Sequence, residues 1–555
     1  MTPVTIELYN KFLRLTICGP ELIFKTTGFL GFLTKAGVEN AVQYRKIISL
    51  IFLFLSLVSC AIAAGQKHEF PLVTLDGGPI IGVIKGESAM FLGIPYASPP
   101  IEDLRWRPPE IMPPWEKPLD ATQPGAHCPQ SRHQEKSSED CLTINVYRPA
   151  LKSEEPLPVL FWIHGGGYRT GTGAYYSSRN INTPAELVDA KLWNRQGVIL
   201  VTLNYRLGAL GFLAHDALDG SQGVNYGLLD IVAGLKWVNR NIEIFGGDKS
   251  RLTIIGSSAG GNTVQTLMVM PQTEGLFSAA ISQSGYGTTV LPRTRHVGAL
   301  YGSPSAEKFS KAILERAIDA SSDGLLAEDL RALTANQLVN ANDGLHYPIV
   351  DGITLPEEPG ILFRQGKQHS VPYMSGGSTY DGSSYKAKMG LSPDTLLAST
   401  EPYADEVRAL YEIETVTYSP EVKQLFGDLR YVLPSRYTTQ QMNRVNQPGY
   451  LYMLSYISPS EREHWRGAPH SWQKRPLFRD KGIPIINDMR QYMVNLVKTG
   501  NPNSIGLPDW PSVAAGKVPW MMFGDEPKVK LDVWQEKLDL LQSVYEHRIH
   551  PLVPQ

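Results

Sequence analysis

The chain has 555 residues, a formal net charge of −2, and 42% hydrophobic and 19% charged residues. This balance excludes an intrinsically disordered chain, a collagen-like repeat and a strongly basic nucleic-acid-binding protein. Glycine and proline number 50 and 41, which together stay below the share, roughly 25–30%, at which low-complexity disorder is expected. We therefore expect a folded protein rich in loops, whose domain count has to come from motifs rather than from length.

One stretch near the N-terminus, residues 47–58 (IISLIFLFLSLV), is apolar enough to concern a membrane. Two basic residues precede it, and the small residues Ala61 and Ala63 follow it. This order is typical of a secretory signal. We predict cleavage just after this point, which divides the chain into an N-terminal extension with its signal, residues 1–64, and one folded domain, residues 65–555. The mature protein is then secreted.

The alternative is that residues 47–64 stay in place as a membrane anchor. Some 44 residues precede the apolar stretch, which is unusual for a signal, but a membrane span needs about 20 apolar residues and this segment is marginal. On the favoured interpretation the mature protein has no stable membrane partner, and its acidic balance predicts no nucleic-acid partner.

Two of the four cysteines, Cys18 and Cys60, fall in the extension, so Cys128 and Cys141 remain as a pair. An even pair in an exported protein indicates a disulfide, here closing a loop of 12 intervening residues. The alternative is two separate thiols.

From about residue 70 onward, strand-like runs alternate with helical segments. The sequence predicts strands at residues 158–164 (PVLFWIH), 197–204 (GVILVTLN) and 251–256 (RLTIIG), with a helix at residues 228–241. Near-continuous apolar strands separated by helices are typical of a parallel sheet covered on both faces. Because no linker, charge block or repeat marks a boundary, we predict one α/β domain with long insertions.

A glycine run, His164-Gly165-Gly166-Gly167, follows the first of these strands. Successive glycines let the backbone approach a substrate carbonyl and point N–H groups at it. Thr170 stands where a dinucleotide-binding GxGxxG motif needs its third glycine, so that function is a poor alternative. We predict an oxyanion hole with Gly166, Gly167 and the N–H of Ala259 as donors.

The pentapeptide GSSAG, residues 256–260, matches GxSxG and stands between the strand RLTIIG and a helix-compatible stretch. A strand that turns sharply into a helix forces a strained backbone at the central serine, so side chains two positions to either side would collide. The motif predicts that Ser258 is held out at the edge of the sheet as a nucleophile. The alternative is a flexible glycine turn.

Further motifs extend along the chain: residues 91–97 (FLGIPYA), 138–145 (SEDCLTIN), 204–208 (NYRLG), 225–230 (NYGLLD), 245–248 (FGGD) and 499–503 (TGNPN), with Trp510-Pro511. With these motifs the chain resembles the type-B carboxylesterase and lipase family, the branch that includes cholinesterases, over nearly everything from residue 80 onward. The resemblance implies an α/β-hydrolase fold with a mostly parallel central sheet. It also implies ester hydrolysis by a serine, an acid and a histidine in that chain order, with no metal and no organic cofactor.

A serine hydroxyl is a weak nucleophile at neutral pH, so it needs an imidazole to take its proton and a carboxylate to orient that imidazole. His470, in GAPH, matches the family's Gly-x-x-His loop. Asp381, before Gly382, aligns with the family's acidic loop, where many relatives carry the longer Glu. The resemblance therefore implies His470 as the base and Asp381 as the acid.

Five other residues compete for roles. His464, in EREHW, is the runner-up base but lacks the matching glycine, and Asp351, in VDGITLP, is an alternative acid that is more typical of a turn. We expect His164 to support the glycine loop. His547 and His550 have an i, i+3 spacing that could suggest a metal site, but no carboxylate group accompanies them and we expect them to be solvated.

Departures from the relatives indicate the substrate. Cholinesterases place a tryptophan in the loop closed by the first disulfide, where it binds a quaternary ammonium, whereas PQSRHQEKSSED between Cys128 and Cys141 has no aromatic residue. Ser257 also replaces the acidic residue that many relatives carry before the nucleophile. Choline esters are therefore not expected as substrates.

The same loop is a much longer lid in the interfacial lipases of the family. We predict an esterase for small to medium esters that works through an acyl-enzyme, with water as co-substrate. A lipase or sterol esterase and a non-catalytic adhesion relative are the alternatives. The second disulfide common among relatives is missing, so we expect packing alone to hold residues 275–327.

Overall fold

The structure is a computed structural model of the chain. It describes residues 4–7, 14–18, 21–25, 70–131, 134–176, 186–298, 303–342, 344, 346–472, 474–478, 482–514 and 516–550. The predicted signal and cleavage region, residues 47–64, lies outside the described residues. The division at residue 65 therefore stays a prediction.

The chain divides into two compact units, Met1–Glu69 and Phe70–Gln555. In the first unit, β1 (Val4–Glu7), β2 (Arg14–Cys18) and β3 (Glu21–Lys25) form an antiparallel sheet in that order. The second unit holds all of the motifs described above.

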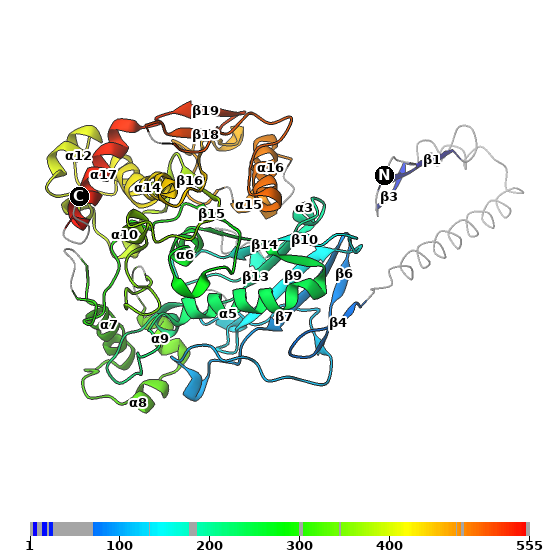
Figure 1. The fold of residues 1–555 in the computed structure, drawn as a ribbon, viewed down its shortest axis with the longest axis horizontal. Coiled ribbons are helices and arrows are strands. Elements are labelled where there is room, and N and C mark those ends of the chain that lie inside the picture. The colour runs from blue at the N-terminus through cyan, green and yellow to red at the C-terminus, as the bar shows by residue number, and fades with distance from the viewer. Residues whose placement is uncertain are drawn as a thin grey trace, which may run out of the picture. The chain divides into compact units, whose positions relative to one another are not determined.

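An 11-stranded sheet forms the centre of the second unit, in the order β19-β18-β17-β16-β15-β14-β10-β13-β9-β7-β6 (Figure 1). Its strands are β6 (Val83–Lys85), β7 (Ser88–Pro95), β9 (Thr143–Pro149), β10 (Leu157–Ile163), β13 (Ile199–Leu203), β14 (Gly247–Ser257), β15 (Ala279–Gln283), β16 (Tyr373–Ser378), β17 (Gly449–Leu454), β18 (Pro519–Phe523) and β19 (Pro527–Leu531). In the part of the sheet from β18 to β13, which includes β10, neighbouring strands pair in parallel. The outer strands, β19 on one side and β9, β7 and β6 on the other, pair antiparallel. The predicted α/β class with a mostly parallel sheet is confirmed.

Alternating side chains of the central strands enter two separate cores. In β10, Val159 and Phe161 join one apolar cluster, whereas Leu160 and Trp162 join the other. Such a strand is apolar at every position because helices cover both faces of the sheet. This explains why the predicted strands read as continuous apolar runs.

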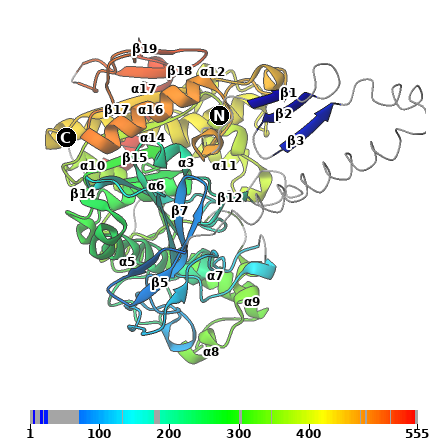
Figure 2. The same cartoon turned by 90° about the vertical axis from the view of Figure 1, so that its right-hand side faces the viewer.

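Helices cover both faces, and Figure 2 shows α5 and α16 on opposite sides of the sheet. The cluster with Val159 receives α5 (Tyr226–Asn241), α6 (Ala259–Leu267), α10 (Pro359–Arg364), α11 (Pro393–Ala398), α12 (Ala404–Leu410), α13 (Pro420–Gly427), α14 (Leu433–Gln441) and α17 (Gln535–Ile549). The cluster with Leu160 receives α3 (Lys191–Asn194), α15 (Lys474–Phe478) and α16 (Pro484–Thr499).

A third, smaller cluster gathers α4 (Gly208–Gly211), α7 (Ala306–Ile318), α8 (Ala327–Arg331) and α9 (Ala335–Ala341). Short strands outside the large sheet are β4 (Leu72–Thr74), β5 (Pro79–Ile81) and β8 (Leu119–Asp120), and the pair β11 (Tyr175–Tyr176) and β12 (Glu186–Leu187). No helix in the described part of the chain is both long enough and apolar enough to span a membrane.

Polar contacts, and not packing alone, hold residues 275–327. Arg293 forms a buried two-pronged ion pair with Glu357, with Nη2 to Oε2 at 2.9 Å. The Ser310 hydroxyl on α7 accepts a hydrogen bond from the N–H of Ala214 at 3.0 Å. The expectation of packing alone is therefore wrong, because a buried ion pair and a buried hydroxyl join this region to segments on either side of it.

Candidate active site

Three side chains from distant parts of the chain meet beyond the carboxyl ends of the parallel strands. Ser258 follows β14, Asp381 follows β16, and His470 lies in the segment after β17. His470 Nε2 lies 2.9 Å from Ser258 Oγ, and His470 Nδ1 lies 2.7 Å from Asp381 Oδ1. Parallel strands all open their carboxyl ends to the same edge of a sheet, which is where α/β proteins place their sites. The topology thus brings together the three residues that the sequence singled out.

The serine turn has the strained geometry that its motif predicted. Ser258 has φ 60° and ψ −121°, a conformation that a residue with a β-carbon rarely adopts. A β-carbon on Gly256 would lie 2.3 Å from the carbonyl oxygen of Gly260, and one on Gly260 would lie 2.1 Å from that of Ile163. The two glycines are therefore required by close backbone approach. The Ser258 N–H donates to the Gln283 carbonyl at 2.8 Å and fixes the turn.

The carboxylate of Asp381 is fully enclosed, and other donors hold it in place. Its Oδ2 accepts from the N–H of Ser378 at 2.7 Å and from the hydroxyl of Ser284 at 3.0 Å. Its Oδ1 faces His470. Because these donors come from β16 and from the residue just after β15, the carboxylate is held in one orientation, and that orientation points Oδ1 at the imidazole.

Backbone contacts join the loops that carry the acid and the histidine. The N–H of Tyr380 donates to the carbonyl of Ala468 at 3.0 Å, and the N–H of Ala468 donates to the hydroxyl of Thr379 at 2.9 Å. The N–H of His470 itself donates to the Ser383 hydroxyl at 2.8 Å. The ring position of His470 is therefore set by its backbone as well as by Asp381.

The loop after β10 presents backbone N–H groups beside Ser258. Gly166 and Gly167 have φ of 122° and 64°, values that favour glycine. Across the described residues, the N–H groups of Gly166, Gly167 and Ala259 donate to no carbonyl and no side chain. Ala259 begins α6, so its N–H is one of the unpaired donors of a helix N-terminus.

His164 packs beneath this loop. Its Nδ1 lies 3.0 Å from the carbonyl oxygen of Gly165, its ring stacks on Tyr205 with centroids 4.4 Å apart, and the Tyr205 hydroxyl donates to the His164 carbonyl at 2.9 Å. Burial lowers the pKa of His164 to about 3, so the ring is neutral near pH 7. It supports the loop, as expected.

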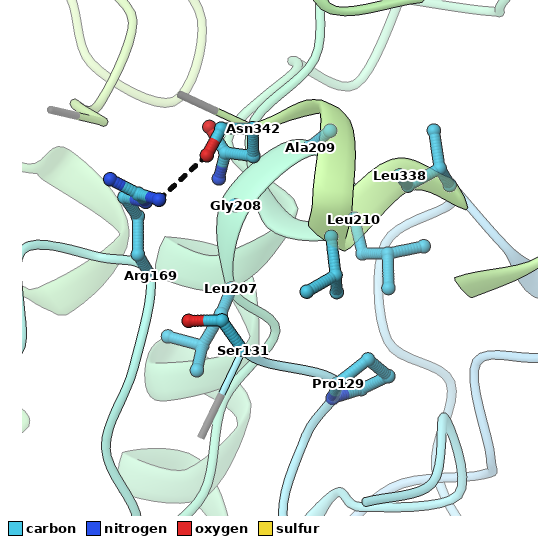
Figure 3. Close-up of a pocket in the computed structure, with 10 residues that line it drawn as sticks. Pro129, Ser131, Arg169, Leu207, Gly208, Ala209, Leu210, Leu338 and Asn342 are labelled. Carbon is cyan, nitrogen blue, oxygen red and sulfur yellow. Dashed lines mark hydrogen bonds between the residues drawn. The ribbon is translucent and has the colours of Figure 1, made fainter. Parts of the chain in front are cut away.

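The turn that follows the glycines is tied to its surroundings from two sides. Arg169 donates from Nη2 to the carbonyl of Asn342 at 2.6 Å (Figure 3), and it also donates from Nη1 to the carbonyl of Gly344. The side chain of Gln130 exchanges two hydrogen bonds with the backbone of Gly171, at 2.8 and 2.9 Å. These contacts limit the freedom of the glycine loop.

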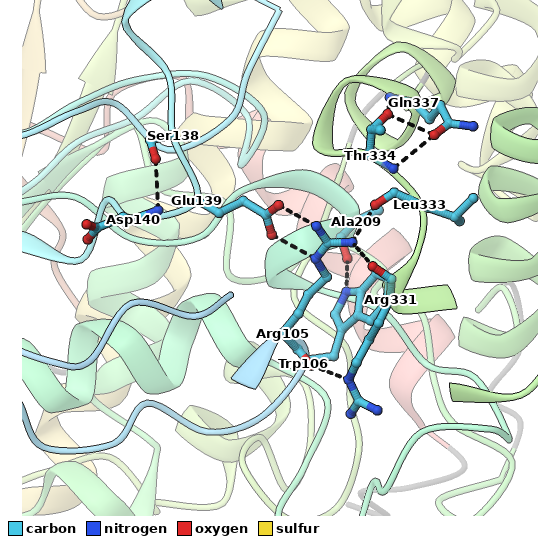
Figure 4. Close-up of polar contacts among 10 residues, drawn as sticks. All are labelled: Arg105, Trp106, Ser138, Glu139, Asp140, Ala209, Arg331, Leu333, Thr334 and Gln337. Carbon is cyan, nitrogen blue, oxygen red and sulfur yellow. Dashed lines mark hydrogen bonds and ion pairs between the residues drawn. The ribbon is translucent and has the colours of Figure 1, made fainter. Parts of the chain in front are cut away.

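Cys128 and Cys141 form a disulfide, which confirms the predicted pairing. The loop that it closes is anchored, because Glu139 accepts two hydrogen bonds from Arg105, including one from Nε at 2.8 Å. Arg105 in turn donates from Nη1 to the carbonyl of Arg331 at 2.8 Å, as Figure 4 shows. The loop is thus fastened to the helical cluster of α7 to α9.

Sequence reasoning missed the aromatic side chain that packs on the histidine. Tyr431 lies in a π-helical turn, Asp428–Val432, between α13 and α14, and its ring stacks on that of His470 with centroids 4.4 Å apart and planes 29° apart. No local motif marks this residue. Asp428 in the same turn is buried; burial raises its pKa to about 7, although Tyr411 donates to its Oδ2 at 3.0 Å.

A pair of serines links the residues that flank the nucleophile and the histidine. The hydroxyl oxygens of Ser257 and Ser471 lie 3.0 Å apart. Ser471 has φ 56°, which is unusual for serine. Ser257 was singled out for its missing charge, and the structure adds that its hydroxyl joins two segments of the site.

The competing residues stay outside this arrangement. His464 is exposed, and so are His547 on α17 and His550 directly after that helix. Asp351 is buried and accepts from the N–H groups of Thr354 at 2.8 Å and Leu355 at 3.0 Å, as in a structural turn. Within the described ranges, no group of three or more His, Cys, Asp or Glu is placed to hold a metal ion.

A serine on a strained strand-to-helix turn, joined through a histidine to a buried carboxylate at the edge of a parallel sheet, defines the α/β-hydrolase class of protein. Comparison with known proteins specifies the family. The profile of the carboxylesterase family matches residues 69–541. The chain belongs to this family and is a carboxylic ester hydrolase.

Individual relatives match over most of their length. The para-nitrobenzyl esterase of Bacillus subtilis (strain 168) is 34% identical, over 84% of this chain and 97% of its own. Liver carboxylesterase 1F of Rattus norvegicus is 28% identical, over 83% of this chain and 92% of its own. A solved structure of a PNB esterase superposes with a TM-score of 0.73 and 29% identity, and the match covers 85% of this chain and all of that one.

Proposed function

We propose that this protein is a serine esterase that cleaves small to medium carboxylic esters, with Ser258 as nucleophile, His470 as general base and acid, and Asp381 as the group that orients the imidazole. The observation that carries the proposal is the continuous hydrogen-bonded chain from Ser258 Oγ through His470 to Asp381, at 2.9 and 2.7 Å. The ionised carboxylate can only accept, so Nδ1 carries the proton and Nε2 is left to accept from the serine.

In the first half of the reaction, Nε2 of His470 takes the hydroxyl proton as Ser258 Oγ attacks the ester carbonyl. The carbonyl oxygen becomes an oxyanion, which accepts hydrogen bonds from the N–H groups of Gly166, Gly167 and Ala259. His470 then gives its proton to the leaving alcohol, and an acyl-enzyme remains. Loss of one such oxyanion donor typically costs about 2.7–4 kcal/mol of barrier.

In the second half, water takes the place of the alcohol. His470 takes a proton from water, the resulting hydroxide adds to the acyl carbonyl, and collapse of the second oxyanion returns the proton to Ser258 Oγ and releases the acid. The enzyme is regenerated without any further reactant.

The preference for small, dispersed esters over an oil interface rests on the disulfide loop. The loop is short, and Glu139 and Gln130 tie it to Arg105 and to the glycine loop. A lid that opens at an interface has to move and expose apolar surface, and these contacts oppose such movement. Rates on a short-chain triglyceride should therefore not rise when its concentration passes the solubility limit; a sharp rise there would favour the lipase alternative.

The decisive test of the catalytic roles compares two adjacent serines. Ser258→Ala should abolish hydrolysis of p-nitrophenyl acetate and labelling by an organophosphorus ester, with no change in the thermal unfolding curve. Ser257→Ala, the matched variant, should still be labelled. Labelling of S258A, or turnover by it, would remove Ser258 from the mechanism, and wild-type protein that takes no label would favour a non-catalytic binding role.

We also propose that the mature protein is secreted after removal of residues 1–64. The Cys128–Cys141 disulfide supports an oxidising compartment. N-terminal sequencing of protein from the culture medium should begin near residue 65. A membrane-bound product that retains residues 47–64 would favour the anchor.

A further inference from the structure

The π-helical turn beside His470 carries a buried arginine that no carboxylate neutralises. Arg430 is 7% exposed, and in the described part of the chain it forms no ion pair. Its hydrogen-bond partners are the hydroxyls of Tyr347, which accepts from Nη1 at 3.3 Å, and Tyr431, whereas its Nε has no partner. Burial of an unpaired charge costs free energy, so buried charges are normally paired.

Two other arginines that are enclosed in this chain have a carboxylate partner. Arg206 pairs with Asp230 at 2.7 Å, and Arg548 pairs through its Nη1 with Glu358 at 3.2 Å. Arg430 differs from these two, and it differs from the buried Arg148, which also has no carboxylate partner among the described residues but donates from Nη1 to the backbone carbonyl of Pro149 at 2.8 Å. An enclosed guanidinium without a protein anion is suited to bind an anion from outside.

Aromatic rings surround the guanidinium instead. Its Cζ lies 4.0 Å from the ring centroid of Tyr286, 5.4 Å from that of Tyr347, and 5.7 Å from those of Phe426 and Tyr431. Each such contact offsets part of the desolvation of the cation, by about 0.5–2 kcal/mol. The rings stabilise the positive charge, and the hydroxyl of Tyr347 accepts from Nη1, but neither supplies a negative charge to pair with the guanidinium.

This cation lies next to the reacting groups. Tyr431 contacts Arg430 and also stacks on His470. Tyr347, a hydrogen-bond partner of Arg430, is partly exposed, so the aromatic cluster reaches the protein surface. The second terminal nitrogen, Nη2, is not among the fully enclosed polar atoms that lack a partner.

The charges around the site favour an anion as well. The carboxylate of Asp381 is enclosed and occupied by His470, Ser284 and Ser378. Burial raises the pKa of Asp428 to about 7, which weakens its negative charge near neutral pH.

We propose that Arg430 is a specificity-determining residue that binds a carboxylate of the substrate, so that the preferred esters carry a second, ionised acid group. The proposal rests on the proposed esterase function and names its substrate class. A hydrogen-bonded pair with a charged group predicts a gain of about 10- to 100-fold in kcat/KM for the charged ester over a neutral ester of equal length. The carboxylate can belong to the acyl part or to the alcohol part, and the substrates below distinguish the two.

The test measures kcat/KM by pH-stat for two matched pairs of esters. Monomethyl glutarate against methyl pentanoate places the charge in the acyl part, and 4-acetoxybutyrate against butyl acetate places it in the alcohol part. The charged ester should be preferred in one pair by wild-type enzyme. Arg430→Met should lower that preference by about 10- to 100-fold, and Arg430→Lys should retain part of it.

Arg436→Met is the matched control, because Arg436 is equally buried on the following helix but pairs with Asp539 at 2.7 Å. It should lower the melting temperature and leave the preference as in wild type. Arg430→Met should not lower the melting temperature as much, since it removes an unpaired buried charge. A residue that only holds the fold would show the opposite: a large loss of stability and no change in preference.

Direct binding separates this proposal from the proposed function. Isothermal titration of wild-type enzyme with glutarate should give heat that R430M abolishes and R436M retains. If wild-type enzyme hydrolyses methyl pentanoate but neither prefers a charged ester nor binds glutarate, the Arg430 proposal is overturned and the esterase stands. If it binds glutarate through Arg430 but hydrolyses no ester, the esterase proposal fails and the anion site stands.

Discussion

The replacement Asp381→Asn tests the site most sharply, because it changes one atom of the hydrogen-bonded chain and leaves the shape intact. The N–H of Ser378 points at Oδ2 of Asp381 at 2.7 Å, so the oxygen of the new amide must take that position. The opposite rotamer would set two N–H donors face to face. The amide nitrogen then takes the place of Oδ1, 2.7 Å from His470 Nδ1.

An NH2 group at that position donates to Nδ1, and this donation forces the proton of the neutral imidazole onto Nε2. Nε2 then cannot accept the hydroxyl proton of Ser258. Where an acid-to-amide change produces the wrong tautomer in a triad, kcat falls by about 10⁴-fold, which is about 5.4 kcal/mol of barrier. We expect a loss of this size for D381N.

The assay is initial-rate hydrolysis of p-nitrophenyl acetate at neutral pH, with thermal unfolding as the check of folding. Asp351→Asn is the matched control, since Asp351 is also buried and also accepts backbone N–H groups, but it stands apart from Ser258. D351N should lose stability and keep kcat. Asp381→Glu should keep much of the activity, because a longer carboxylate restores the acceptor. A kcat for D381N within a factor of about ten of wild type would refute the tautomer argument.

Three further predictions concern stability. Burial raises the pKa of Asp428 above its unfolded value of 3.8 to about 7. Because the folded state keeps this proton to a higher pH than the unfolded state, the free energy of unfolding should fall as pH rises between those values. Urea unfolding at pH 4 and pH 7 should show this fall in wild type and a smaller difference between the two pH values in Asp428→Asn. Replacing Cys128 and Cys141 by serine should lower the free energy of unfolding by about 2–4 kcal/mol, and a reducing agent should then cause no further loss. Arg206→Met should lower the free energy of unfolding by about 3–5 kcal/mol, because Asp230 is left buried and unpaired. Adding Asp230→Leu should recover part of this loss. If the losses of the two single variants simply add in the double variant, the pairing is contradicted.

Several features of the site could be predicted from the sequence because they depend on local backbone geometry. The turn at Ser258 needs glycine at 256 and 260, since any β-carbon there would collide with a neighbouring carbonyl. The glycines at 166 and 167 adopt positive φ for a similar local reason. Such requirements determine the residue types at a few consecutive positions, so a short motif reveals them. A continuous apolar run such as β10 likewise indicates a strand that is buried on both faces of the sheet.

Other features depend on which distant segments meet, and no short pattern records them. Ser284 reaches Asp381 across 97 residues, and Ser257 reaches Ser471 across 214. The missing cysteines indicated that packing alone holds residues 275–327, but the ion pair between Arg293 and Glu357 also holds this region. The partner of a buried charge depends on which distant segments lie side by side in the folded chain.

The isolation of Arg430 is the strongest case. In sequence it is one of 52 lysines and arginines, and nothing near it distinguishes it from an ordinary solvated cation. Only the folded chain encloses it among aromatic rings, with no ion pair in the described part of the chain, beside a tyrosine that stacks on the imidazole of His470. Local sequence motifs thus predict ester hydrolysis. The proposed preference among esters, in contrast, depends on the three-dimensional surroundings of Arg430.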